Sequence, residues 1–162
     1  MRGERTKRIA ERLSLAGPMT RHPRAEQRYR SHRQKSKTKN AVCSFCDIAM
    51  NGGPQYVGES EYCLIITNVF GYDIWDGCGV VEHMMIIPKR HVASLDELTS
   101  DEKLDYITLA AKYEADGYSL YARSPGNVTK SVIHQHMHLI KTDNTRKKWM
   151  IYIRKPHIRL AR

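Results

Sequence analysis

The sequence predicts an α+β fold with a mostly antiparallel β-sheet. Short segments with the apolar pattern of strands outnumber helical segments, one amphipathic helix separates them, and no internal repeat is present. The chain has 162 residues, which fits a single domain, and 41% of them are hydrophobic, which is enough for a core. This composition excludes a wholly disordered chain and a coiled rod.

The first expected elements are two strands on either side of a loop. Residues 61–67 form a continuous apolar segment that is typical of a buried strand. Residues 82–87 form the second strand, and Pro88 ends it because proline cannot donate to the hydrogen-bond ladder. Between them, residues 69–80 are rich in glycine and aspartate, which indicates a loop.

One main helix is expected between Thr99 and Asp116. Thr99 can cap its first turn together with Glu102 three residues later, and Gly117 suits its C-terminal end. Its expected apolar stripe consists of Leu104, Ile107 and Ala111. Further strands are expected at residues 118–122, 131–141 and 149–154, the last at a sheet edge.

The formal net charge of +10 resides in the first 40 residues. Residues 1–40 hold 13 Lys/Arg and 3 Asp/Glu, whereas residues 41–162 hold 14 of each kind. Runs of like charge repel and stay solvated, so we expect residues 1–40 to be a basic, disordered tail and residues 41–162 to be the folded domain. The tail's charge would also attract RNA or DNA phosphates without reading base sequence.

No apolar run approaches the ~20 residues that span a bilayer, and the basic N-terminus lacks the apolar stretch of a signal peptide. We therefore expect a cytoplasmic protein that makes no membrane contact. Its four cysteines are then expected to be reduced, which makes the closely spaced pair Cys43 and Cys46 the informative one.

Three alternating histidines carry the strongest chemical signal. In a strand, His134, His136 and His138 would share one face, about 6.5–7 Å apart. The residues expected to face the core instead are Ile133, Met137 and Leu139. A neutral imidazole can exchange protons or attack phosphorus, so such a row favours a chemical site. A fortuitous polar face, or a metal site made from all three histidines, is the other interpretation.

The segments around these histidines resemble those of the histidine triad (HIT) family. His134-Gln-His-Met-His-Leu-Ile140 is similar to the family's His-φ-His-φ-His-φ-φ motif, in which φ is apolar, although Gln135 is polar. His83-Met-Met-Ile-Ile-Pro-Lys-Arg-His91 resembles the family's His-φ-φ-φ-φ-Pro-Lys-x-His strand. Cys43-Ser-Phe-Cys46 resembles the opening of zinc-containing members. The resemblance covers about residues 43–142 and implies a HIT-like fold and a homodimer.

The resemblance also implies a nucleotide hydrolase that acts on the α-phosphate. His136 would attack phosphorus and form a covalent nucleotidyl-histidine, which water then resolves. His138 would contact the phosphate oxygens or the leaving group, Ser131 would donate a hydrogen bond there, and His83 would complete the histidine cluster. The substrate would be a nucleoside phosphoramidate or a dinucleoside polyphosphate.

Structural zinc is a further implication of the resemblance, with Cys43, Cys46, His91 and His134 as ligands. Two cysteines alone cannot close a tetrahedral site, and all four ligands together leave no open position for water. Zinc would brace the N-terminal segment against the catalytic strand. The alternative is a pair of ordinary buried thiols and a surface histidine.

The candidate substrate-binding residues are Asn68, Arg123 and Lys130. Asn68 stands where many family members carry an acidic ribose-binding residue, and its amide can also hydrogen-bond a ribose. Arg123 and Lys130 can bind a polyphosphate, or they are solvated turn charges. The loop 69–80 is longer than usual for the family, and its aromatic residues either contact a base or cover the sheet edge.

Other functions stay open at this level. Transferase and phosphorylase branches of the superfamily carry glutamine at the third histidine, so His138 favours hydrolysis, whereas Asn68 favours those branches. A DNA-deadenylating, aprataxin-like enzyme fits the basic tail, but no zinc finger follows the triad. A nucleotide- or RNA-binding module with a degenerate site fits the tail and the altered loops.

Overall fold

A six-stranded antiparallel sheet organises this computed structural model, which describes residues 20–21, 23–38, 43–146, 150–154 and 157–161. The strand order is β1-β2-β4-β6-β5, and the short β3 pairs with β4. The strands are β1 Tyr56–Glu59, β2 Cys63–Thr67, β3 Ile74–Trp75, β4 Cys78–Pro88, β5 Ser119–Ala122 and β6 Met137–Arg146. The helices are α2 Pro23–Thr38, α3 Ser44–Asn51 and α4 Ser100–Ala115. This arrangement confirms the predicted α+β class.

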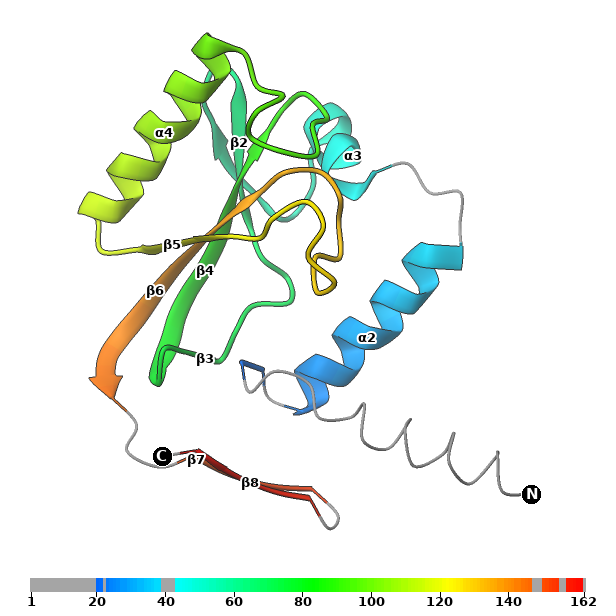
Figure 1. Ribbon diagram of the computed structural model, residues 1–162, viewed down its shortest axis with the longest axis vertical. Coiled ribbons are helices and arrows are strands. Elements are labelled where there is room, and N and C mark those ends of the chain that lie inside the picture. Colours follow the sequence, from blue (N-terminus) through cyan, green and yellow to red (C-terminus); the bar gives the residue numbers. More distant parts are fainter. Residues whose placement is uncertain (1–19, 22, 39–42, 147–149, 155–156, 162) are drawn as a thin grey trace.

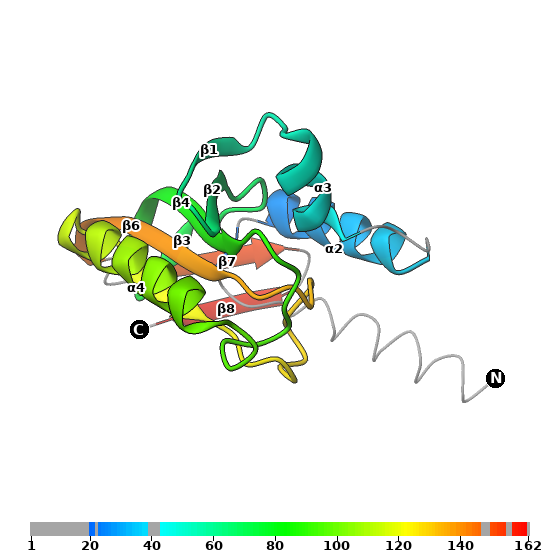
Figure 2. The same cartoon turned by 90° about the horizontal axis from the view of Figure 1, so that it is seen from above.

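Helices cover both faces of the sheet, with α4 on one face and α3 and α2 on the other (Figures 1 and 2). Because side chains alternate along a strand, neighbouring residues of β4 enter different cores. Ile86 packs with Tyr106 of α4, whereas Met85 packs with Phe45 of α3. His138 lies opposite Met85 in the β4–β6 ladder and therefore faces the α3 side.

Helix α4 begins with the predicted capping box. The Thr99 side chain accepts from the Glu102 backbone N–H, and the Glu102 carboxylate accepts from the Thr99 backbone N–H. Gly117 follows the helix with φ of 88°, a conformation that favours glycine.

The predicted apolar stripe of α4 is wrong. Leu104 is 66% exposed and Ile107 is 57% exposed, and Ala111 is also exposed. The buried residues of the helix are Glu102, Tyr106 and Ala110. Both sets have helical spacing, so periodicity alone did not distinguish the inner stripe from the outer one.

The strand expected at residues 131–141 begins later than predicted. It starts at Met137 and continues to Arg146, so His134 and His136 lie in an irregular segment just before it. Consequently Ile133 is 69% exposed and does not face the core. Leu139 is fully buried, as expected.

Two other segments differ from expectation. The loop 69–80 contains β3 and the start of β4, which pair through Ile74–Gly79 and Trp75–Cys78. The strand β7, Met150–Arg154, is no edge of the main sheet, because it pairs with β8, His157–Ala161, in a separate two-stranded sheet.

The N-terminal 40 residues also differ from a disordered tail in the part that the structure describes. Pro23–Thr38 form the helix α2, and Thr20 and Arg21 precede it with contacts to the folded domain. Residues 1–19, which belong to the same predicted tail, lie outside the described residues.

Candidate active site

The last two histidines of the triad meet on the α3 side of the sheet. The rings of His136 and His138 lie 5.1 Å apart in an edge-to-face arrangement, and both side chains are buried. Phe45 of α3 packs edge-on against His136 at 5.2 Å. His134 instead turns towards the two cysteines, so the three histidines do not serve a single centre.

A backbone carbonyl fixes the tautomer of His136. Its Nδ1 lies 2.8 Å from the carbonyl oxygen of His134, which can only accept a hydrogen bond. The neutral ring therefore carries its proton on Nδ1 and has its lone pair on Nε2. Burial, reinforced by the nearby charges of Lys130 and Arg123, lowers the pKa of His136 to about 4. The ring is thus neutral at neutral pH, the form in which imidazole is a nucleophile.

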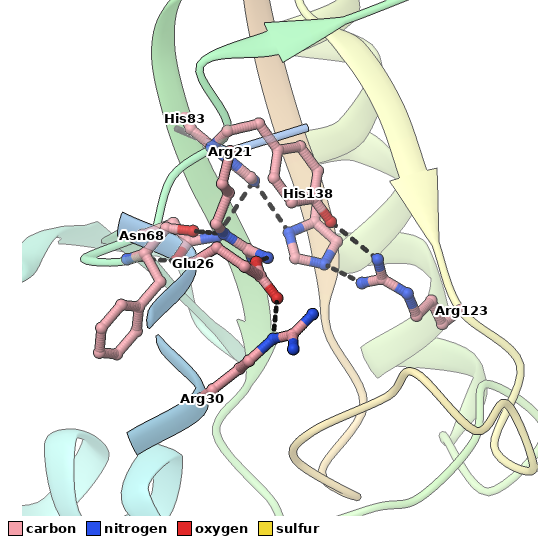
Figure 3. A network of polar contacts seen from close by, with 9 residues as sticks. Arg21, Glu26, Arg30, Asn68, His83, Arg123 and His138 are labelled. Atoms are coloured by element: carbon pink, nitrogen blue, oxygen red, sulfur yellow. Dashed lines mark hydrogen bonds and ion pairs between the residues drawn. The ribbon is translucent and has the colours of Figure 1, made fainter. Parts of the chain in front are cut away.

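His83 and His138 form a hydrogen-bonded pair beside it (Figure 3). The Tyr72 backbone N–H donates to His83 Nδ1 over 2.9 Å, so neutral His83 carries its proton on Nε2. Burial, followed by the charges of Arg21 and Arg123, keeps His83 neutral by lowering its pKa to about 3. Its Nε2–H then donates to His138 Nδ1 over 2.9 Å.

This direction of donation decides the state of His138. Burial lowers the pKa of His138 well below its ordinary value, so the ring is neutral and carries its own proton on Nε2. Asn68 Nδ2 also approaches His83 Nε2, at 3.2 Å, but that contact joins two donors and is secondary to the 2.9 Å bond.

Arg123 and His138 consequently present two donors to one region. Arg123 Nη1 lies 3.3 Å from His138 Nε2, and both nitrogens carry protons (Figure 3). Arg123 Nη2 donates to the Tyr72 hydroxyl over 2.8 Å, while the buried Nε has no partner among the described residues. An oxyanion between the two groups would accept from both of them.

A pocket of about 360 Å³ opens over these groups. Its volume falls at the small end of the range for ligand sites. Of the predicted site residues, those that line it are Asn68, Arg123, Ser131, His136 and His138, together with the predicted metal ligand Cys43. His83 lies behind His138 and lines a neighbouring hollow instead.

Lys130 is the predicted substrate-binding residue that the structure does not bring to this pocket. Its ammonium donates to the Ala93 carbonyl over 3.1 Å and to Gln135 Oε1 over 3.0 Å. Gln135 is buried at a position where the motif usually carries an apolar residue, so Lys130 satisfies a buried polar group. The Lys130 ammonium therefore lies on Ala93 and Gln135 and not in the pocket.

A second cluster joins the four predicted metal ligands. One ligand atom each from Cys43, Cys46, His91 and His134 lies within 4.8 Å of the others. Sγ–Nδ1 distances are 3.5 Å for Cys43–His134, 3.6 Å for Cys46–His134 and 3.2 Å for Cys46–His91. Zinc–ligand bonds of about 2.0–2.3 Å in a tetrahedron place ligand atoms roughly 3.5 Å apart. The four residues therefore fit a closed zinc site.

The orientation of His134 suits metal binding as well. Its Nε2 lies 2.9 Å from the Pro88 carbonyl oxygen and must donate to it, which leaves the Nδ1 lone pair facing both sulfurs. Metal-ligating histidines commonly donate their second ring N–H to a carbonyl in this way.

Sequence reasoning missed Arg21 and Tyr29, and it left the role of the aromatic residues of loop 69–80, Tyr72 among them, undecided. Tyr72 is buried, stacks on Trp75 at 5.4 Å and packs on His83 at 4.5 Å, so the long loop covers the histidine pair. Arg21 and Tyr29 come from the segment expected to be disordered and line the same pocket. Only the enrichment of the loop in aromatic residues gave a signal in the sequence.

Comparison with known proteins identifies the family. The HIT domain model matches residues 54–145, which is more than half of the chain, so this protein belongs to the HIT domain family. The matched range contains His83, His91 and the triad, whereas Cys43 and Cys46 precede it.

Solved structures show the same fold. A HIT family hydrolase from Clostridium thermocellum is 22% identical, with 68% of this chain and 99% of that chain covered and a TM-score of 0.50. A hypothetical protein from Leishmania major is 26% identical (72% and 88% covered, TM-score 0.51). A member of the HIT family from Bacillus subtilis is 25% identical (64% and 75% covered, TM-score 0.50).

A membrane-spanning helix is not found in the described part of the chain, because none of its helices combines sufficient length with sufficient apolar character.

Proposed function

We propose that this protein is a nucleotide hydrolase in which His136 attacks the α-phosphorus of a nucleotide substrate. The observation that carries the proposal is the contact between His136 Nδ1 and the His134 carbonyl, which directs the Nε2 lone pair away from the backbone. His136 and His138 line the same pocket, so a phosphate there reaches a nucleophile and two donors together.

The reaction would proceed in two displacements. In the first, a bond forms between His136 Nε2 and phosphorus while the bond to the leaving group breaks. The leaving group takes the electron pair and, where it is an amine, a proton from solvent, while the His138 Nε2–H and the Arg123 guanidinium donate hydrogen bonds to the charge that develops. In the second, water attacks phosphorus and loses a proton to solvent, and the P–N bond breaks with its electron pair returning to His136 Nε2, which releases the nucleoside monophosphate and free His136.

Turnover assays test this proposal and its closest enzyme alternative. Purified protein is offered adenosine phosphoramidate and diadenosine tetraphosphate, each with and without inorganic phosphate, beside a His136→Asn variant. A hydrolase releases AMP without phosphate, and the variant is inactive. Turnover that requires phosphate would identify a phosphorylase instead, and equal activity of the variant would contradict the role of His136.

Zinc is proposed as the structural metal of the second cluster. It would be held by Cys43, Cys46, His91 and His134, and with four protein ligands it has no open position for a substrate. Its contribution would be to tie α3 to the segment that positions His136.

The thiols of the described cysteines are free, which suits a reducing, cytoplasmic compartment.

A nucleic-acid contact is a second candidate function of the N-terminal segment. Arg24 and Arg28 are exposed on α2, and residues 1–40 carry the whole net charge of the chain. Nonspecific RNA binding through these cations would weaken steeply as salt rises and vanish on deletion of residues 1–40. RNA affinity that survives the deletion would contradict it.

We further propose a homodimer in which the outer face of α4 is covered. Leu104 and Ile107 expose large apolar side chains on this face, and burying apolar surface drives association.

A further inference from the structure

The segment Thr20–His32 reaches the pocket from outside the matched HIT domain, which begins at residue 54. Arg21, Tyr29 and His32 line the pocket that also holds His136 and His138. Without this segment, the pocket would lose the part of its wall that these three residues form.

The segment is fixed to the loop that follows β2. The backbone N–H groups of Asp73 and Ile74 donate to the Thr20 carbonyl over 2.7 and 3.2 Å. Tyr29 packs edge-on against Phe70 with ring centres 5.5 Å apart, and His32 lies 5.0 Å from the same ring. The polar and aromatic contacts act together, so the segment has a defined position beside the site.

Arg21 occupies the centre of these contacts. Its Nε donates to the Phe70 carbonyl over 2.7 Å, and its guanidinium lies 4.3 Å from the Tyr29 ring and 4.7 Å from the Tyr72 ring. The contact with Glu26 is longer, at 3.4 Å, and only 7% of the Arg21 side chain is exposed. Glu26 is shared, because its other carboxylate oxygen accepts from Arg30 over 3.0 Å, so the group of Arg21, Glu26 and Arg30 keeps a net positive charge of one.

Tyr72 connects Arg21 to the chemical groups of the site. The Arg21 guanidinium lies against the Tyr72 ring, and the Tyr72 hydroxyl accepts a hydrogen bond from Arg123. The two arginines therefore lie on either side of the His83–His138 pair, as Figure 3 shows. None of the described residues that line the pocket is acidic, so the pocket is cationic at two places.

We propose that Arg21 is a specificity-determining residue of this active site, which favours nucleotides with several phosphates over nucleotides with one. The inference rests on the proposed nucleotide site. Two fixed positive charges in a partly buried pocket interact more strongly with a polyphosphate than with a single phosphate, because each added negative charge contributes in the low local dielectric.

Binding in the full-length chain tests this role independently of turnover. The parent protein is His136→Asn, which prevents hydrolysis, and the probes are AMP and ATP in isothermal titration calorimetry. We expect ATP to bind more tightly than AMP, and Arg21→Gln to weaken ATP binding by roughly tenfold and AMP binding by less than about threefold. The matched control is Lys112→Gln, an equal charge change at an exposed residue of α4 that does not line the pocket, which should alter either affinity by less than about twofold.

Each other outcome has a definite meaning. Equal weakening of AMP and ATP by Arg21→Gln would show that Arg21 only anchors α2, and unchanged affinities would show that it does not contribute. Either result overturns the proposal. If the parent protein bound neither nucleotide, the proposed function itself would fail, and this inference with it.

Discussion

Backbone carbonyls give two histidines of one motif two different chemistries. The His134 carbonyl holds the proton of His136 on Nδ1, and the Pro88 carbonyl holds the proton of His134 on Nε2. One ring therefore offers Nε2 to the pocket, and the other offers Nδ1 to two cysteine sulfurs. The proposed nucleophile and the proposed metal ligand therefore differ in which ring nitrogen carries the lone pair.

His83 gives a residue-scale prediction on pH. Its pKa is about 3 in the folded protein, against about 6.5 in an unfolded chain, so the unfolded state binds the proton more readily. The stabilising effect of neutral His83 is complete above pH 6.5 and is lost as pH falls from 6.5 towards 3. The wild-type free energy of unfolding should fall by up to about 1.4 kcal/mol per pH unit more than that of His83→Gln in this range. Urea denaturation at successive pH values measures both, and parallel profiles would contradict the assignment.

Arg123 and Lys130 give a matched pair of cations that the sequence could not separate. Arg123 lines the pocket beside His138, whereas Lys130 supports Gln135. We expect Arg123→Gln to lower kcat/KM by about 10- to 100-fold, because a donor to developing charge is lost. Lys130→Gln should change it by less than about threefold. Steady-state kinetics of both variants would contradict this account if Lys130→Gln had the larger effect.

At the scale of elements, the metal cluster joins α3 to the segment before β6. Cys43 precedes α3 and Cys46 lies in its first turn, while His134 precedes β6. Cys46→Ser should therefore abolish stoichiometric zinc and lower the thermal midpoint, since a structural site contributes its binding energy to folding. The control is Cys78→Ser, because Cys78 lies at the start of β4 outside the cluster. Elemental analysis of purified protein that found equal zinc in both variants would rule out the Cys₂His₂ site.

The same scale shows how far sequence patterns determine elements. The capping residues of α4 and the buried β2 strand were predictable, because local chemistry decides them. The buried stripe of α4 was not predictable, because the exposed residues Leu104 and Ile107 have a helical spacing as good as that of the buried Tyr106 and Ala110. The motif identified the triad correctly, but alternation along an assumed strand misplaced Ile133, because β6 begins only at Met137.

At the scale of the whole molecule, a charge run in the sequence proved to be an ordered helix beside the site. Charge repulsion predicts a solvated segment. A count of charges takes no account of tertiary contacts, such as that of Tyr29 with Phe70 or the ion pairs of Glu26 with Arg21 and Arg30. Such contacts depend on the folded loop after β2, which no local pattern describes.

The proposed dimer belongs to this scale too. Replacing an exposed leucine at an apolar interface with lysine buries an unpaired charge, which is unfavourable. Leu104→Lys should therefore convert a dimer to a monomer in sedimentation velocity, while the surface control Lys112→Gln should leave it dimeric. A monomeric wild-type protein at micromolar concentration would contradict the assembly.

The central claim is covalent catalysis by His136, and trapping the intermediate tests it most directly. Wild-type protein is mixed with substrate, quenched within milliseconds in base, where phosphoramidate bonds survive, and digested for mass spectrometry. The account predicts a nucleotidyl adduct on the peptide that carries His136, with the modification on that residue and absent from His136→Asn. Turnover by the wild-type protein with no adduct, or an adduct on a different histidine, would contradict it.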